Sequence, residues 1–339
     1  MYSLEEFDAY SRGYLLSWEK KSTVRNHERT RLDLNSIEQL EFTFPLKQYL
    51  EYPEIKSLPQ KDLHPFYLQW LCDMLSNVAR NEVEVIADLC SKLANQNLGI
   101  ELSNAIKQVA ITIATDEYYH AYVAREMLAD FEELIGCVPA GPKKPNVETN
   151  ASAIRSNKEQ LPQRLTQIEH FKNSVPQELS NIALIVLLCI LENFVVDEFV
   201  VMAENKQNGN PFSTYHREHL QDEGRHKAFF QKLLSYIWSA ISEEDRIILG
   251  QVIADYAIQF FPRSTLEKRI QANTRFLSKF NIPNSAVQSI AYDAAITESS
   301  KPLCEDLQIK CLMSLMNVAG ITSHAPTYQM FLDNDLIAA

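Results

Sequence analysis

Apolar side chains recur at intervals of three and four residues along most of the chain, which is the period of an amphipathic α-helix. Such stripes run over residues 71–93, 106–127 and 229–237, and residues 178–203 are apolar on nearly every side. The last pattern is typical of a helix buried at the centre of a protein. No strong alternation of apolar and polar residues predicts a β-strand, so the chain is expected to be all-α.

Clusters of Pro, Gly and Asn divide this pattern into separate helices. We expect a short helix near residues 3–20, an irregular stretch over about 22–62, and four long helices near 64–97, 101–135, 177–207 and 213–240. Two or three further helices fill residues 243–298, and the last forty residues carry an ambiguous pattern. Candidate N-caps are Thr214, Ser264 and Ser242, which has Asp245 at the spacing of a capping box.

Four long helices joined by short links predict a four-helix bundle. No shift in composition marks a domain boundary, so we expect one helical domain over residues 1–339, with its bundle core at about 64–240 and additional helices at both ends. A content of 46% hydrophobic and 22% charged residues is ordinary for a globular protein and excludes disordered and fibrous classes.

The charge balance excludes some partners. The 339 residues include 32 basic and 44 acidic side chains, a formal net charge of −12. General binding to nucleic acid or to an anionic membrane requires a basic surface, so we expect neither partner. Only 8 Gly are present, and neither G-x-G-x-x-G nor G-x-x-x-x-G-K occurs, which argues against nucleotide chemistry through Rossmann or P-loop folds.

Cysteine usage and the apolar segments favour a soluble, cytoplasmic protein. The six Cys include no C-x-x-C pair, and a disulfide framework is not expected in a chain of this length. The acidic N-terminus lacks the apolar core of a signal peptide, and the longest apolar run, residues 182–190, is too short to span a membrane.

Two of the predicted helices carry the same charged motif within their apolar stripes. Residues 116–120 read Asp-Glu-Tyr-Tyr-His and residues 222–226 read Asp-Glu-Gly-Arg-His, so both are D-E-x-x-H. Glu and His three residues apart share one helical face and can bind the same metal ion. Two Glu-x-x-His motifs, with one Glu from each of two further helices, are the ligand set of di-iron carboxylate bundles.

The two remaining Glu are sought in the other long helices. Glu82 falls on the apolar stripe of its helix, whereas Glu84 points to nearly the opposite side, so helix phase favours Glu82. Glu192 lies in the most apolar helix, where Asp197 and Glu198 are further candidates nearer the helix end.

The arrangement of these motifs is repeated along the chain. Thirty-five residues separate Glu82 from Glu117, and thirty-one separate Glu192 from Glu223. A single D-E-x-x-H arises easily by chance on a solvated helix, but this repetition does not. Four carboxylates inside one apolar bundle repel one another and are costly unless cations neutralise them. Carboxylate and imidazole ligands together suit iron or manganese better than zinc.

Three other residues extend this constellation. His219 lies four residues before Glu223 and seven before His226, on the same helical face, so it is either a third imidazole ligand or a surface or supporting His. Asp116 and Asp222 are either solvated or lie behind the ligands, where each would accept the Nδ1–H of a ligand His. The remaining five His, at positions 27, 64, 170, 216 and 324, are not expected to be ligands.

At this point the sequence resembles the p-aminobenzoate N-oxygenase family (AurF-like di-iron oxygenases). The resemblance covers roughly residues 15–260, includes the segment Trp-Glu-Lys-Lys-Ser-Thr-Val-Arg at residues 18–25, and includes the motif at residues 222–226. It implies a ferritin-like bundle with two iron ions held by four Glu and three His. The matching residues here are Glu82, Glu117, His120, Glu192, His219, Glu223 and His226, and family spacing also allows Glu84 in place of Glu82.

The resemblance implies an enzyme that uses O2 to oxidise the nitrogen of an amine to a hydroxylamine, nitroso or nitro product, in a secondary-metabolite pathway. It also implies a homodimer. The electrons are expected from a reductase or other external donor, because no flavin, haem or iron–sulfur motif is present. An oxidase acting at carbon and a non-catalytic ferritin-like metal-binding protein remain the alternatives.

The substrate could be an aryl or an aliphatic amine. Arg80, Arg263, Arg269 and Arg275 are candidates for binding a substrate carboxylate, with a surface role as the alternative. Residues beside the predicted ligands either line a cavity or pack in the core, and these are Tyr118, Tyr119, Asn193 and Phe194.

Overall fold

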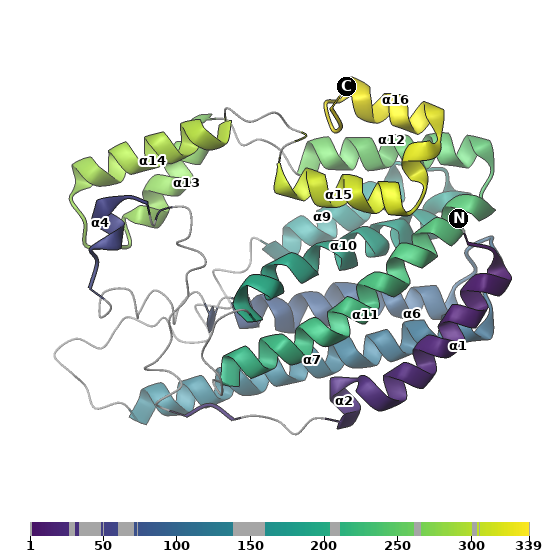
Figure 1. Cartoon of the computed structure of the whole chain (residues 1–339), viewed down its shortest axis with the longest axis horizontal. Helices are drawn as coiled ribbons and strands as arrows, with labels where there is room; N and C mark the ends of the chain where they lie inside the picture. The colour runs from purple at the N-terminus through teal and green to yellow at the C-terminus, as the bar shows by residue number, and fades with distance from the viewer. Residues whose placement is uncertain are drawn as a thin grey trace.

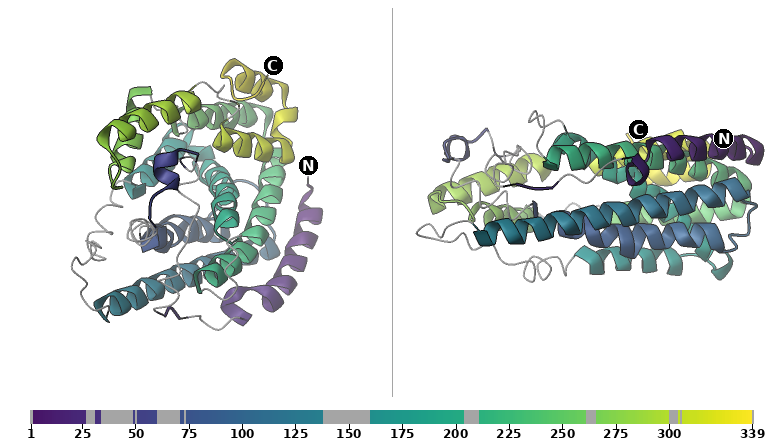
Figure 2. Two further views of the ribbon diagram at one scale, coloured as in Figure 1. Left: turned by 60° about the vertical axis from the view of Figure 1, so that its left-hand side comes forward. Right: turned by 90° about the horizontal axis from the view of Figure 1, so that it is seen from below.

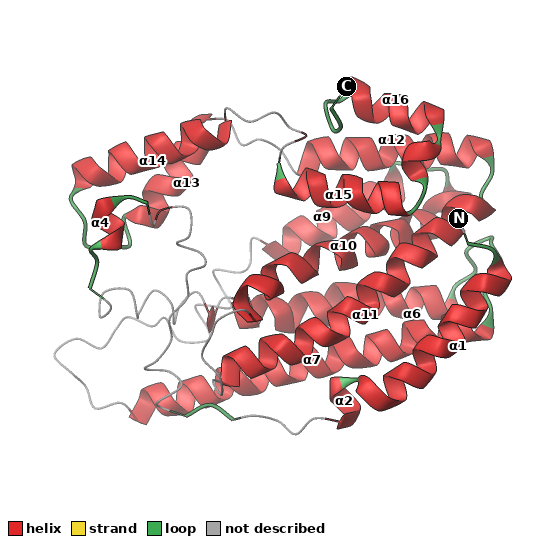
Figure 3. Ribbon diagram, viewed as in Figure 1, coloured by secondary structure: helices red, strands yellow, loops and turns green. Residues whose placement is uncertain are grey.

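The computed structural model describes residues 2–26, 31–33, 49, 51–59, 71–72, 74–137, 160–203, 211–260, 266–299, 304 and 306–338. These residues form helices, turns and connecting segments, and none of them lies in a β-strand (Figure 3). The predicted all-α fold is therefore confirmed.

Four helical segments form the centre of the molecule (Figure 1). In the first, helical residues 74–81 continue through a π-helix, η2 (Glu82–Ala87), into α6 (Asp88–Asn95). The others are α7 (Asn104–Cys137), α10 (Ser180–Ala203) and α11 (Pro211–Ala240). Helix α10 packs along α11, and α7 packs along η2 and α6, so the predicted bundle is present. Figure 2 shows the long helices running side by side along the length of the molecule.

The N-terminal helix α1 (Leu4–Lys21) covers α7 and α11. It begins at a capping box, in which the Ser3 hydroxyl accepts the Glu6 N–H and the Glu6 carboxylate accepts the Ser3 N–H. Its buried side includes Tyr14 and Trp18, four residues apart, and the short helix α2 (Thr23–Asn26) follows directly. This packing places α2, which follows the end of α1, against α7 and α11.

The other helices lie outside this core, most of them along its upper side in Figure 1. Helix α9 (Gln160–Asn173) packs on α10 and on α12 (Glu243–Phe260), and α15 (Leu307–Val318) packs on α10. Helices α13 (Leu266–Leu277) and α14 (Asn284–Ser299) pack together, and α16 (Ala325–Asp333) packs on α12. The short elements are α4 (Pro53–Lys56), η4 (Gln177–Leu179) and η6 (Ile321–Ser323).

The helix boundaries correct part of the sequence interpretation. Thr214 is not an N-cap, because α11 begins three residues earlier, at Pro211. Ser242 is a cap, since its hydroxyl accepts the Asp245 N–H at 3.1 Å and donates to the Asp245 carboxylate at 2.8 Å. Ser264 lies outside the described residues. Helix α9 was not predicted, although its positions 165, 168 and 171 follow the helical period.

The most apolar stretch, Gln177–Phe194, is long and apolar enough to cross a membrane by length and composition alone. In the structure, 72% of this stretch is buried inside the protein. Its position between α9, α11 and α15 accounts for its composition, because a helix covered on all sides has no polar face. Among the described cysteines, Cys90, Cys189 and Cys304 are free thiols.

Candidate metal centre

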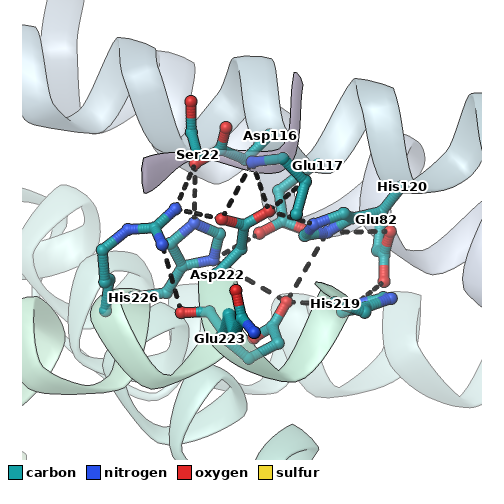
Figure 4. Close-up of polar contacts among 12 residues, drawn as sticks. Ser22, Glu82, Asp116, Glu117, His120, His219, Asp222, Glu223 and His226 are labelled. Carbon is teal, nitrogen blue, oxygen red and sulfur yellow. Dashed lines mark hydrogen bonds and ion pairs between the residues drawn. The ribbon is translucent and has the colours of Figure 1, made fainter. Parts of the chain in front are cut away.

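All seven residues predicted as ligands meet in one buried cluster between the core helices. Figure 4 labels all of them except Glu192. None of them exposes more than 6% of its surface, and they are Glu82, Glu117, His120, Glu192, His219, Glu223 and His226. Helix α7 places Glu117 and His120 on one face, and α11 does the same for its three ligands, because residues three, four and seven apart share a helical face. The first segment and α10 each supply one Glu.

The ligand atoms fall into two groups of four, each with all of its atoms within 4.8 Å of one another. The first group contains Glu82, His120, His219 and Glu223, and the second contains Glu117, Glu192, Glu223 and His226. Glu223 belongs to both groups. The arrangement could therefore hold two metal ions side by side, at what we call the first and the second position, with Glu223 common to both.

The first position is rich in imidazole. Nε2 of His219 lies 3.1 Å from an oxygen of Glu82 and 3.1 Å from an oxygen of Glu223. Nδ1 of His120 lies 3.8 Å from Glu82 and 3.7 Å from Glu223, and the rings of His120 and His219 stack with their centroids 3.9 Å apart. The Tyr215 hydroxyl lies 3.3 Å from Nδ1 of His219, on the side of the ring away from the cluster.

The second position is rich in carboxylate. Nδ1 of His226 lies 2.9 Å from Glu117, 3.7 Å from Glu192 and 3.7 Å from Glu223. Two imidazoles serve the first position and one serves the second, so the two positions differ in charge. An ion at the second position would be surrounded by three carboxylates and one neutral ring.

Six buried side-chain atoms of the cluster make no hydrogen bond of regular geometry with the described residues. They are Glu82 Oε2, Glu117 Oε1, His120 Nδ1, Glu192 Oε2, Glu223 Oε2 and His226 Nδ1. Buried polar atoms are normally paired, so six such atoms in one place need an explanation. Metal ions at the two positions would use these lone pairs, and the residues present therefore fit a pair of ions.

Without an ion, protons and hydrogen bonds offset the negative charge of the clustered carboxylates. Burial, together with the neighbouring Glu117, raises the pKa of Glu82 well above its usual range, and burial with Glu223 raises the pKa of Glu192. Burial also acts on Glu223, but the hydrogen bond with His219 and the charge of the neighbouring His226 outweigh it and hold the pKa of Glu223 well below its usual range. A cation that binds here must displace the protons held at such sites.

Asp116 and Asp222 lie directly behind the cluster and are fully buried. Nε2 of His226, on α11, lies 3.2 Å from Asp116 on α7, and Nε2 of His120, on α7, lies 3.2 Å from Asp222 on α11. Each Asp thus holds the His of the other helix. The prediction of a supporting carboxylate fits this geometry, but the expected ring atom was wrong: Nε2 faces the Asp, and Nδ1 faces the cluster.

Sequence reasoning missed the residues that hold these two Asp. The indole N–H of Trp18 lies 2.9 Å from both oxygens of Asp116. The Thr23 hydroxyl and the Arg225 guanidinium both donate to Asp222, and the Thr23 N–H lies 3.3 Å from it. The sequence did offer one signal, the resemblance of residues 18–25 to the N-terminal segment of the p-aminobenzoate N-oxygenases. That resemblance assigned no role to individual side chains.

The choice between Glu82 and Glu84 has a clear geometric answer. Glu82 is 6% exposed and belongs to the first position. The Glu84 side chain is 43% exposed and lies 3.3 Å from Arg80 on the surface of the same helix. Helix phase therefore indicated the carboxylate that reaches the cluster. The side chains of Asp197 and Glu198 lie outside the described residues.

A narrow pocket reaches the first position. Its lining comes from α2, α7 and α11, and it consists of Thr23, Tyr119, His120, Val123, Met127, Tyr215, Glu218 and His219. Its cavity volume is about 10 Å³, which is room for roughly one water molecule. The pocket leads to His120 and His219, and no Lys or Arg is among its lining residues.

The other candidates for substrate contact separate into two sets. Tyr119 lines the pocket, whereas Tyr118 is 56% exposed and points away from the cluster. Asn193 accepts a hydrogen bond from Gln231, and Phe194 packs against the apolar core.

The candidate Arg residues lie elsewhere. Arg80 pairs with Glu84, Arg275 is exposed on α13, and Arg269 lies on the same helix. Arg263 lies outside the described residues.

The histidines that were not expected to be ligands lie outside both ligand groups where the structure describes them. His216 is buried, and its Nδ1 lies 2.6 Å from the Phe212 carbonyl oxygen. Burial lowers the pKa of His216 to about 4, so the ring is neutral at pH 7. His170 lies on α9, and His324 contacts Glu243. Positions 27 and 64 are outside the described residues.

Comparison of the chain with protein-family models and with curated protein sequences finds no match. The fold and the site define the protein as an all-α bundle with a buried cluster of Glu and His that could bind metal.

Proposed function

We propose that the protein is a di-iron monooxygenase that uses O2 to oxidise the nitrogen of an amine substrate. The observation that carries the proposal is the pair of four-ligand groups that share Glu223. Carboxylate oxygens mixed with imidazole nitrogens suit iron better than zinc, which favours closed tetrahedra of thiolate and imidazole. The described cysteines contribute no ligand to either group.

The choice of nitrogen over carbon as the oxidised atom rests on the resemblance stated above. In the p-aminobenzoate N-oxygenases, the third imidazole on the last core helix distinguishes the site from those of ferritins and fatty-acyl desaturases. His219 occupies that place here, with Nε2 3.1 Å from both Glu82 and Glu223. This contact supports a ligand role rather than a surface role for His219.

The residues of this chain would hold the two ions, bind the substrate and keep water out. When bound, the iron pair would activate O2, with the net reaction R–NH2 + O2 + 2 e⁻ + 2 H⁺ → R–NHOH + H2O. Asp116 holds Nε2 of His226, and Asp222 holds Nε2 of His120, so that Nδ1 of each of these two rings can bind an ion. The two electrons would come from an external donor.

The narrow pocket suggests how the substrate is chosen. Among the residues that line the pocket, Glu218 is the acidic one, and Tyr119 and Tyr215 contribute aromatic rings to the same lining. A carboxylate at this place favours a neutral or cationic amine over an amine that carries its own carboxylate. The small volume requires the lining side chains to move apart before anything larger than O2 or water enters.

The test is metal analysis followed by rapid mixing. Purified protein should bind two iron ions per chain. After reduction and mixing with O2, a transient absorbance should decay faster when an amine is added, and mass spectrometry should detect a hydroxylamine, nitroso or nitro product. Two ions with oxidation only at carbon would favour a carbon oxidase, and many ions per chain in a cage would favour iron storage. No stoichiometric metal in folded protein would refute the proposal.

A further inference from the structure

The N-terminal helices α1 and α2 each contact one of the two Asp that lie behind the metal centre. Trp18 donates its indole N–H to Asp116, at 2.9 Å from each oxygen. Thr23 donates its hydroxyl to Asp222, and its backbone N–H lies 3.3 Å from the same carboxylate. Trp18 is 8% exposed and Thr23 is 1% exposed, so both contacts are shielded from water.

Each contact leads to a different metal position. Trp18 holds Asp116, which faces Nε2 of His226, and the Nδ1 of that ring faces the carboxylate-rich second position. Thr23 holds Asp222, which faces Nε2 of His120, a member of the imidazole-rich first position. The two chains of contacts share none of these residues, although both Asp lie near the guanidinium of Arg225.

We propose that Trp18 and Thr23 are positioning residues of the metal centre, each of which secures one of its two ions. The inference rests on the metal-binding part of the proposed function and is independent of the substrate. An imidazole that donates from Nε2 to a fixed carboxylate presents the lone pair of Nδ1 to the cluster. A carboxylate that has lost a donor rotates more freely, so the ring loses both its orientation and its preferred tautomer.

The two contacts differ in how much support remains when one is removed. Asp222 also accepts a hydrogen bond from Arg225, whereas the same guanidinium lies 3.8 Å from Asp116. Asp116 is therefore more weakly held after loss of Trp18 than Asp222 is after loss of the Thr23 hydroxyl. Loss of such outer support costs on the order of 10- to 100-fold in metal affinity. We expect Trp18→Phe near the upper end of this range and Thr23→Val near the lower end.

Matched variants separate this role from a packing role. Thr23→Val removes the hydroxyl at nearly constant volume, and Thr23→Ser restores it. Trp18→Phe removes the indole N–H, and Trp238→Phe makes the same change at a buried ring three helical turns beyond the last ligand of α11. Each protein is loaded anaerobically with two ferrous ions per chain and mixed with a coloured ferrous chelator, and the release of iron is followed by absorbance.

In Trp18→Phe and in Thr23→Val, one of the two ions should leave about 10- to 100-fold faster than in the wild type, and the other at close to the wild-type rate. The double variant should release both ions quickly, while Thr23→Ser and Trp238→Phe should behave as the wild type. The metal-free single variants should melt within a few degrees of the metal-free wild type, because each loses at most one buried hydrogen bond.

Wild-type release from both single variants would overturn the inference. Faster release of both ions together, accompanied by a lower melting temperature of the metal-free variant, would also overturn it and assign the contacts to packing alone. A wild-type protein that holds no iron would refute the metal centre itself and this inference with it. A protein that holds two ions but oxidises no amine would leave the inference standing.

Discussion

Glu82 and Glu84 provide a matched test of the metal centre, because they lie two residues apart and differ in environment. Glu82 is buried in the first position, whereas the Glu84 side chain is 43% exposed and pairs with Arg80. Replacing each by Gln removes one charge at constant shape. We expect Glu82→Gln to abolish about half of the stabilisation by iron and Glu84→Gln to leave it intact.

The size of the effect follows from ligand linkage. An ion that binds only the folded chain stabilises it by about 2.7 kcal/mol at a free concentration 100-fold above its Kd, so two ions contribute about 5.4 kcal/mol. The unfolding entropy of a chain of 339 residues is about 0.7 kcal/mol/K. Iron should therefore raise the melting temperature of the wild type by about 8 °C and that of Glu82→Gln by about 4 °C.

The assay is thermal unfolding of metal-free and ferrous-loaded protein under nitrogen, followed by circular dichroism. The metal-free forms provide the control. Burial and Glu117 raise the pKa of Glu82 well above its usual range, which favours the protonated carboxyl when no ion is present, and Gln is the neutral counterpart of that form. Loss of the exposed pair between Glu84 and Arg80 costs at most about 1 kcal/mol, so all three metal-free proteins should melt within a few degrees.

Two results would refute this reasoning. Equal melting temperatures with and without iron in the wild type would mean that the cluster binds no metal. A loss of half the shift in Glu84→Gln, with a full shift in Glu82→Gln, would mean that the exposed carboxylate is the ligand and that the described rotation of this helix is wrong.

Three further predictions concern other parts of the site. His219→Ala should lose one of two iron ions in metal analysis and lose amine oxidation, whereas retention of both would show that His219 is no ligand. Val123→Phe fills the pocket at the first position and should slow amine oxidation at least about tenfold with both ions retained, while Tyr118→Ala, at an exposed site, serves as the control. Burial lowers the pKa of His216 to about 4, so the unfolded chain binds this proton first and iron-loaded protein should lose up to about 3 kcal/mol of stability between pH 6.5 and pH 4. Denaturant unfolding across this range should show a weaker pH dependence for His216→Gln, and identical profiles would contradict the assignment.

The central helices and the cluster were predictable because both depend on local spacing. Residues three, four and seven apart share a helical face whatever the rest of the chain does, so the motifs at Glu117 and Glu223 could be placed inward from the apolar stripes around them. The same argument placed Glu82 inward and Glu84 outward. The start of α11 was missed, although a Pro at residue 211 is a common first residue of a helix.

The contacts of Trp18 and Thr23 could not be predicted in this way. They join residues 98 and 199 positions apart in the chain, and no period in the sequence relates such positions. The ring atom that faces each Asp was also beyond reach, because it depends on how α7 and α11 are rotated against each other. Only the tertiary packing of the helices determines that rotation.

The π-helix η2 has a consequence for how the first metal position could be lost. Its winding accommodates about one residue more per turn than the α-helix that follows it. Deleting a single residue between Glu82 and Ala87 would restore regular winding and leave everything before it in nearly the same rotational position, because a π-turn absorbs one extra residue. Regular winding of the same residues at full length would instead turn everything before them by roughly 100° relative to α6. Glu82 would then leave the cluster while Leu89 and Leu93 of α6 kept their places in the core. The wider winding of η2 thus maintains the first position, and a change that tightened it without shortening the chain could convert a two-ion site into a one-ion site.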